Sequence, residues 1–451
     1  MKRLLLAITL LLAVAATARA QEFRTGYFLE NYSYAYRINP AAPIEGKPYF
    51  FAGLGLGNVT AEAHTNLSLP SFIARDKNGE LAFPLLSSDF TMEQALSGLS
   101  SVNDLGLNLN MNLLTIGWQG QNNRITAEVN LRSDSYLFVP IDMFSLVKLG
   151  LSSLADSEFD QKYSFAGLDV GTDLYTELAV GYTQRIGDML TVGGRIKGLF
   201  GIASVGAGLD FSVQPGLEKD IAGAVDGTLH VAAPITVPIG KFDYEGKQYY
   251  DIAATDVSDL SGLWNQSAKG TAGWGLGFDL GVTFEPIDGL YLSAAVNDLG
   301  FINWNCSVNG HMFYDSNTMG ELDSEDYKTI LAMEVLNGGR YTTALNYSIH
   351  AGAKYKMPFY DRLSVGLLGT MQRHYKEARL GLDITPLDFI SLAGSAALSN
   401  YGGSLGAALN LKFPIVNFFI GTDAFFFNLT RQFIPVDPVN STVTVGLLLA
   451  I

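Results

Sequence analysis

The chain has 451 residues, 44 of them acidic and 29 basic, so its formal net charge is −15. This negative balance argues against nucleic acid or an anionic membrane surface as an electrostatic partner, and the single cysteine excludes an intrachain disulfide. Only 16% of the residues are charged, against about 25% in typical soluble domains, which argues against an ordinary soluble enzyme.

The first twenty residues have the pattern of a secretory signal peptide. Lys2 and Arg3 precede an apolar run at 4–16, and residues 18–20 (Ala-Arg-Ala) form a small-x-small cleavage site. The pattern predicts export and cleavage after Ala20. The apolar run is too short for a membrane-spanning helix, and no cysteine follows the cleavage site to carry a lipid anchor.

Segments that alternate with a period of two are found throughout the rest of the chain. In 124–132, 273–284 and 377–384, apolar side chains alternate with polar residues or glycine, so each segment has one apolar and one polar face. Their lengths are close to the roughly 9–11 residues of a tilted spanning strand, whereas soluble strands average about 5–6. The pattern predicts an all-β fold, a transmembrane antiparallel β-barrel. A soluble β-sandwich is the alternative.

Two kinds of connection join the predicted strands. Barrels of this type place short turns in the periplasm and long loops outside, so both chain ends should lie in the periplasm and the strand number should be even. We expect about 14 strands, with 12 or 16 left open because 49–69 and 201–233 are ambiguous. Short turns are predicted at 119–123, 187–188, 285–289, 357–361, 385–387 and 413–415. Long loops are predicted at 134–172, 214–271 and 305–340.

Two short loop helices are predicted outside the spanning strands. The first covers 89–99, with Asp89 as its possible N-cap. The second covers 140–150, where Ile141, Phe144 and Val147 have helical spacing. Each helix could pack in its loop or plug the lumen, and packing in a loop is the favoured interpretation.

Three local patterns occur in order along the chain. They are Gly-Tyr-Phe-Leu-Glu-Asn at 26–31 followed by Arg-Ile-Asn-Pro-Ala at 37–41, Val-Pro-Ile-Asp-Met-Phe-Ser-Leu-Val-Lys-Leu-Gly at 139–150, and Asn-Asp-Leu-Gly-Phe-Ile-Asn-Trp at 297–304. Together they resemble an uncharacterised family of Bacteroidota outer-membrane β-barrels, distantly similar to long-chain fatty-acid porins and to type IX secretion accessory barrels. The resemblance implies an outer-membrane location but no established activity, so it supplies no functional residues. The chain departs from one common feature of such barrels, because it ends in Leu-Ala-Ile rather than on an aromatic residue.

Catalytic and metal chemistry find little support in the sequence. No histidine lies in a metal-spaced pair, and His350 and His374 fall on predicted inward faces, where a polar lining role suits them. The acidic loop at 305–340 lacks EF-hand spacing, so a solvated loop is favoured over weak cation binding. We therefore expect no enzyme activity, no catalytic residue, no metal site and no cofactor.

Charged residues on the predicted inward faces are the candidate lumen lining. Charges of both signs in one cavity should pair, because an unpaired charge away from bulk water is costly. The candidates are Arg124, Glu128, Arg132, Glu177, Arg195, Lys197, Asp279, Lys354, Arg379 and Asp383.

Glycines also cluster on the predicted inward faces, at 206, 208, 273, 275, 277 and 281. Glycine removes side-chain volume and lets another part of the backbone approach. We expect this wall to receive the N-terminal segment 21–48 as a plug, or to line a permeation path. The alternative is that glycine only relieves crowding in a narrow, sealed barrel.

The predicted organisation is a signal peptide at 1–20, an N-terminal plug or periplasmic segment at 21–48, and an outer-membrane barrel at 49–451. The leading functional hypothesis is passive passage of a small or hydrophobic solute through a partly plugged lumen. The alternative is a non-conducting scaffold barrel that binds a protein of a secretion or surface complex. Outer-membrane lipid is expected around the barrel, and no nucleic acid is expected as a partner.

Overall fold

The computed structural model describes most of the chain beyond the predicted signal peptide. Residues 1–20, and with them the predicted cleavage site, lie outside the described residues, as does His374. The described ranges are 22–44, 46–55, 57–67, 72–149, 163–164, 166–215, 221–234, 240–244, 246–251, 270–319, 333–336, 339–373, 375–424 and 439–450.

The protein is a closed, 14-strand antiparallel β-barrel, as the sequence predicts. β1 (Tyr49–Leu54) and β2 (Val59–Thr65) form one interrupted strand, and both pair with β24 (Val439–Ala450) to close the ring. On the other side, β1 pairs with β5, and each remaining ring strand pairs with its neighbours. The other ring strands are β5 (Val102–Gln119), β6 (Asn123–Pro140), β8 (Leu168–Ile186), β9 (Leu190–Pro215), β13 (Gly273–Ile287), β14 (Leu290–Asn305), β18 (Ser348–Lys356), β19 (Leu363–Gln372), β20 (Lys376–Leu387), β21 (Ile390–Ser399), β22 (Gly402–Lys412) and β23 (Val416–Thr422).

The predicted alternation sets which side chains face outward. Trp274, Leu280 and Leu380 are 53%, 59% and 63% exposed, although they are large and apolar. The intervening polar residues are buried inside the barrel, as in β6, where Glu128 and Asn130 are almost inaccessible. An apolar outside and a polar inside are the arrangement of a barrel surrounded by lipid.

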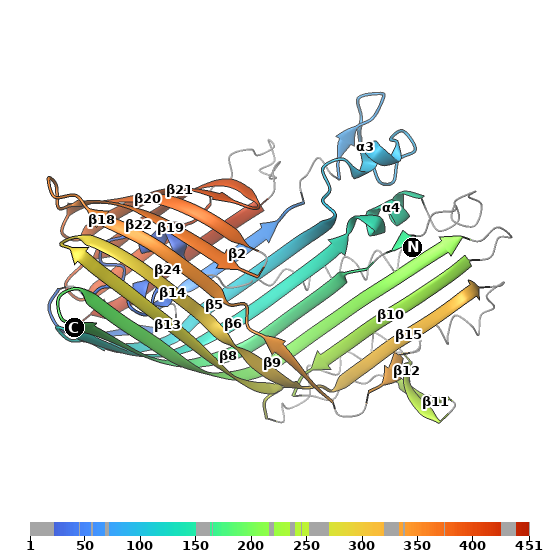
Figure 1. Cartoon of the computed structure of the whole chain (residues 1–451), viewed down its shortest axis with the longest axis horizontal. Helices are drawn as coiled ribbons and strands as arrows, with labels where there is room; N and C mark the ends of the chain where they lie inside the picture. Colours follow the sequence, from blue (N-terminus) through green and yellow to red (C-terminus); the bar gives the residue numbers. More distant parts are fainter. Residues whose placement is uncertain are drawn as a thin grey trace.

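The short turns lie together at one end of the barrel, where β1 begins and β24 ends (Figure 1). One predicted turn is misplaced, because β20 continues through 385–387 and the turn follows at 388–389.

At the opposite end, the three predicted long loops contain more β-structure than expected. β6 and β8 extend into 134–172, and β9 and β10 pair along their lengths beyond the ring (Figure 1). These extensions continue the ladders of the ring. Backbone hydrogen bonds to neighbouring strands therefore keep them in the sheet. The additional strands are β7 (Tyr163–Ser164), β10 (Ile221–Ala232), β11 (Gly240–Tyr244), β12 (Lys247–Asp251), β15 (Val308–Met319), β16 (Met333–Val335) and β17 (Arg340–Ala344), with a separate hairpin of β3 (Ala74–Arg75) and β4 (Leu81–Ala82).

Both predicted loop helices are present at this end, as α3 (Met92–Leu96) and α4 (Ile141–Leu149) (Figure 1). The N-cap of α3 is Thr91 rather than Asp89, because Thr91 and Gln94 form a reciprocal capping box. Among the described residues, no helix is long and apolar enough to span a membrane.

The N-terminal segment, residues 22–44, contributes no strand to the barrel. It contains a short 3₁₀ turn, η1 (Arg24–Tyr27), and one turn of helix, α2 (Ala35–Ile38). Its aromatic and aliphatic side chains form one apolar cluster with inward residues of the wall, including Phe419. The main core therefore lies within the barrel, around this segment.

Candidate functional site

The lumen contains two networks of buried ion pairs, and the N-terminal segment supplies one arginine to each. Because residues 22–44 pack against inward side chains from many strands, their polar groups reach partners far away in the sequence. Arg24 and Arg37 are both buried, and their guanidinium groups contact carboxylates of the wall.

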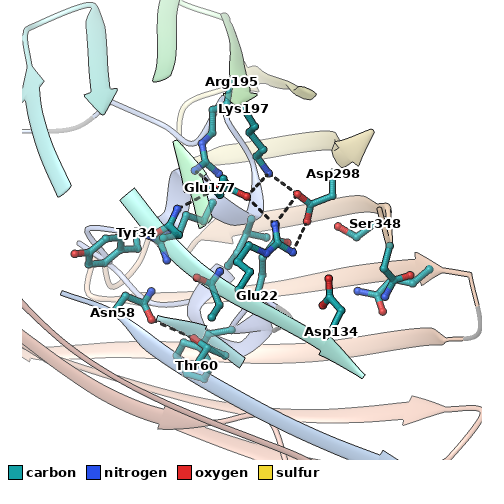
Figure 2. A pocket seen from close by; sticks show the side chains of 18 of the residues that line it. Glu22, Tyr34, Asn58, Thr60, Asp134, Glu177, Arg195, Lys197, Asp298 and Ser348 are labelled. Atoms are coloured by element: carbon teal, nitrogen blue, oxygen red, sulfur yellow. Dashed lines mark hydrogen bonds and ion pairs between the residues drawn. The ribbon is translucent and has the colours of Figure 1, made fainter. Parts of the chain in front are cut away.

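The first network, here called the Glu128 network, joins β6, β8, β9, β13 and β14. The carboxylate of Glu128 accepts from Arg37 at 2.7 Å and also pairs with Arg195. Asp298 accepts from Arg132 at 2.8 Å, and the Lys197 ammonium lies 2.5 Å from the same oxygen (Figure 2). The members of the network are Arg37, Glu128, Arg132, Glu177, Arg195, Lys197, Asp279 and Asp298.

The Glu128 network contains four cations and four anions, so its formal charges cancel. Buried ions are tolerated when they are paired and hydrogen-bonded, since separation would leave an uncompensated charge. Arg37 is the only member that comes from the N-terminal segment. Without it the wall would carry one excess negative charge.

The second network, here called the Arg24 network, lies between β2, β20 and the end of β23. The Arg24 guanidinium is 3.2 Å from Glu62, 3.3 Å from Asp423 and 3.6 Å from Glu377. The backbone N–H groups of Arg24 and Thr25 also donate to Asp423, at 2.9 and 2.6 Å. Arg379, which pairs with Glu377 at 2.7 Å, is the second cation. The Arg24 side chain therefore reduces the formal charge of the site from −2, for three carboxylates and one cation, to −1.

The structure brings six of the predicted lining residues into the Glu128 network and places the others apart. Arg379 belongs to the Arg24 network. Arg124 donates to the backbone oxygens of residues 42 and 43, Lys354 lies 3.3 Å from Glu30, and Asp383 accepts from Ser391. Arg124 and Lys354 thus also contact the N-terminal segment. The six in the Glu128 network are Glu128, Arg132, Glu177, Arg195, Lys197 and Asp279.

Several network residues were not found by sequence reasoning. Asp298 has a φ of +58° at a register shift between β13 and β14, and Asn297 and Asp298 are both buried. Two-residue alternation fails at such a bulge, because consecutive side chains can face the same side. The Asn-Asp-Leu-Gly motif was the available signal, since Asp tolerates a positive φ. Arg24 and Arg37 lie outside any periodic segment.

Wall glycines provide sockets for the N-terminal segment. A Cβ atom at Gly381 would lie 2.3 Å from the Phe28 ring, and one at Gly421 would lie 2.1 Å from the Phe23 ring. Of the six inward glycines predicted to receive the segment, Gly281 does so, since its Cβ would meet Asn39. The other five face other parts of the barrel. Gly206 and Gly208 line a cavity at the outer end, and those at 273, 275 and 277 approach neighbouring strands or Leu345.

We expect Gly381→Leu to weaken docking of the N-terminal segment by about 1–3 kcal/mol, because the new side chain overlaps the Phe28 ring. Hydrogen–deuterium exchange of the amides in 22–44 should accelerate while exchange in the strands is unchanged. Gly206→Leu is the matched control, since a Cβ there has no neighbour within 4 Å. Equal exchange in the two variants would contradict the socket.

Two cavities lie on opposite sides of the N-terminal segment. The central cavity, with a volume of about 30 Å³, lies on the outer side and is lined by members of the Glu128 network (Figure 2). The turn-end cavity, with a volume of about 110 Å³, lies toward the short turns and is lined by residues that include Arg124, Tyr49 and Lys412. Tyr32 lines both cavities. The segment therefore forms the partition between them.

No group of three or more His, Cys, Asp or Glu side chains is placed to hold a metal ion within the part of the chain described. His350 is buried on β18, where its ring nitrogens lie 3.1 Å from the hydroxyls of Thr370 and Ser348 and 2.8 Å from Glu22. These contacts give His350 a place in the polar lining beside the N-terminal segment.

Comparison with solved structures finds outer-membrane channels of low similarity. A TodX deltaS2S3 mutant, described as a monoaromatic hydrocarbon channel, is 9% identical, with a TM-score of 0.44 and coverage of 94% of this chain and 95% of that one. The toluene transporter TbuX of Ralstonia pickettii is 10% identical, with a TM-score of 0.40 and 92% of each chain covered. No curated protein sequence matches the chain.

Comparison with protein families gives one match, over residues 40–423, to a family described as of unknown function, DUF5723. The match covers most of the barrel and begins at the end of the N-terminal segment. The resemblance to an uncharacterised family is therefore confirmed at this level. The chain belongs to the DUF5723 family.

Proposed function

We propose that the protein is an outer-membrane channel for a small solute and that residues 22–44 are its gate. The observation that carries the proposal is the partition of one barrel lumen into two cavities by a single segment, with Tyr32 lining both. Displacement of this segment would join the cavities into one path. The apolar outer face would contact outer-membrane lipid.

The attachment of the gate is compatible with movement. Among the residues that the structure describes, no β-ladder joins 22–44 to the wall, and side chains and a few backbone groups make the contacts. Such contacts can be exchanged for water without disturbing the pairing of any barrel strand. The barrel can therefore remain closed as a ring while its lumen opens.

Barrel size also supports a channel. Eight-stranded barrels are filled by their own side chains, whereas those of 16–18 strands leave an aqueous channel. A ring of 14 strands falls between these cases, and here a separate segment occupies the interior. The scaffold hypothesis gains no support from the comparisons.

A reversible cross-link would test the gate. The hydroxyls of Thr25 and Ser395 are 2.9 Å apart, so Thr25→Cys with Ser395→Cys would tie η1 to β21. Cys306 is replaced by Ser so that no native thiol competes. In proteoliposome swelling assays with small sugars, amines and organic acids, we expect oxidation to abolish uptake and reduction to restore it.

The matched control is Ser135→Cys with Thr172→Cys. These hydroxyls are 3.1 Å apart and would join two strands of the wall, so oxidation should leave uptake unchanged. Uptake by the oxidised Thr25–Ser395 pair at the rate of the reduced pair would show that the gate does not move. Absence of uptake for every solute, in every redox state, would count against a channel.

A further inference from the structure

A further cavity lies at the outer end of the barrel and is here called the outer cavity. Its volume is about 710 Å³, within the roughly 300–1,000 Å³ of small-molecule sites, whereas the central cavity has about 30 Å³. The outer parts of β6, β8, β9 and β10, which extend beyond the closed ring (Figure 1), form its wall together with β17. A molecule the size of a single ring therefore fits here.

One row of residues crosses the wall of the outer cavity and gives it a flat centre. Each residue in the row is the direct partner of the next across the ladders, so the row faces one side of the sheet. A Cβ atom at Gly206 would have no neighbour within 4 Å, so bare backbone forms the floor at this point. In order from β6 to β10, the row is Tyr136, Gly171, Gly206 and His230, and all four line the cavity.

The aromatic side of the outer cavity is supported from the core. The Tyr341 ring, which also lines the cavity, lies 4.7 Å from the His230 ring with an angle of 17° between their planes. On β14, the buried Trp304 ring lies 6.4 Å from Tyr341 at 22°. Rings in such nearly parallel planes stack, and their faces attract cations. The outer cavity therefore offers a surface for an aromatic ring and for a positive charge.

The charge of the lining is strongly negative. Among its described residues are four aspartates and one arginine, a formal charge of −3. Neutral groups donate to two of the carboxylates, because the Ser204 hydroxyl lies 2.5 Å from Asp173 and the backbone N–H of residue 167 lies 2.7 Å from Asp210. Neutral donors leave the negative charge in place, and a cavity lined by one sign of charge concentrates ions of the opposite sign. The four are Asp169, Asp173, Asp210 and Asp226.

The carboxylates are spread along the wall rather than gathered at one point. Asp169 and Asp173 lie in the rows on either side of Gly206, while Asp210 and Asp226 are partners in a row farther out. Nowhere in the described part of the chain are three or more His, Cys, Asp or Glu side chains placed to hold a metal ion. An organic cation, which is larger than a metal ion, suits this arrangement.

We infer that the outer cavity binds an organic cation that carries an aromatic ring, such as an aromatic amine. Its ring would lie over Gly206 between Tyr136 and His230, and its ammonium group would face the aspartates of the adjacent rows. This inference rests on the proposed function, because it names the solute that would enter the channel. It differs from the hydrophobic solute considered from the sequence, since it requires a positive charge.

Calorimetric titration of the detergent-solubilised full chain would test the inference without requiring transport. The probes are 2-phenylethylamine, neutral 2-phenylethanol, anionic phenylacetate, n-butylamine without a ring, and the calcium ion. We expect saturable binding of 2-phenylethylamine that weakens as salt is added, and affinities lower by at least about tenfold for the neutral and anionic probes. For n-butylamine the affinity should be lower by about threefold or more, because no ring contacts the aromatic wall.

Two variants locate the binding. Asp169→Asn with Asp210→Asn changes the charge of the described lining from −3 to −1 and should weaken 2-phenylethylamine binding by about tenfold. The matched control is Asp188→Asn with Asp288→Asn, which makes the same change in charge on exposed turns at the other end of the barrel.

Gly206→Leu should abolish binding because its side chain fills the floor of the cavity. Its control is Gly394→Leu on β21, where a Cβ atom also has no neighbour within 4 Å but lies outside this cavity. Both control variants should bind like the natural chain. The shift of SDS–PAGE mobility on heating reports whether each variant forms a barrel.

The outcomes separate the solute class from the channel. No binding of 2-phenylethylamine, or an equal or higher affinity for any other probe, would overturn the inference. Binding unaffected by Gly206→Leu and by the aspartate pair would place the cation elsewhere and overturn the site. If the aspartate variant does not assemble, Gly206→Leu and the probe series still decide the question. Binding that depends on the site, in a protein that admits no solute to liposomes, would support the site and reject the channel.

Discussion

Deleting residues 24–44 is expected to convert the protein into a constantly open pore. The deletion removes both segment arginines and most of the partition between the two cavities, and it leaves every barrel strand in place. Water would then fill the lumen and hydrate the carboxylates that had faced Arg24 and Arg37. In planar bilayers, the mean conductance should rise by at least about tenfold, with long-lived open states.

A deletion of equal length at 78–98 is the matched control for this experiment. It removes α3 at the outer end of the barrel and leaves the lumen contacts of the N-terminal segment intact. Its conductance should equal that of the full chain. Unchanged conductance after deletion of 24–44 would show that another part of the protein closes the lumen.

The second large effect is expected from Arg24→Gln. Arg24 is 1% exposed, and its loss would leave Glu62, Glu377 and Asp423 with Arg379 as the one nearby cation in the Arg24 network. Removing one partner of a buried ion pair costs about 3–5 kcal/mol. Amide exchange in 22–44 should therefore accelerate by roughly a hundredfold or more, because about 1.4 kcal/mol corresponds to a factor of ten.

Two comparisons test the electrostatic origin of this effect. Arg24→Gln with Asp423→Asn should recover part of the lost protection, since the carboxylate left unpaired is removed together with the arginine. Arg37→Gln should cost less than Arg24→Gln, because Glu128 keeps Arg195 as a partner. A double variant that is no better than Arg24→Gln would assign the effect to packing.

The sequence predicts the barrel well because a spanning strand must present one face to lipid. That requirement gives every strand the same two-residue pattern, which is visible in 273–284 without any knowledge of its neighbours. The outer strands β10 and β15 escape the prediction because they lie within 214–271 and 305–340, which the sequence pattern predicts to be loops. Their pairing is set by the ladders that they extend.

The charged lining could be predicted only in part, for two physical reasons. Regular alternation places Glu128 and Arg195 inward, but it fails at the bulge that turns Asp298 into the lumen. The contacts of Arg24 and Arg37 depend on a segment without regular periodicity that folds inside a ring formed by the rest of the chain. The closed ring determines which carboxylate pairs with which arginine. No short stretch of the sequence indicates this pairing.

The position of Arg24 also has a consequence for assembly. Its partner Glu62 lies on β2 and its partner Asp423 directly follows β23, and these two strands are brought together by β24, which pairs with both of them. The N-terminal segment is synthesised before the strands that hold it, and contacts between such distant residues form late because closing a long loop is costly. The seating of Arg24 would therefore mark the end of barrel biogenesis, when the last strand has joined the first.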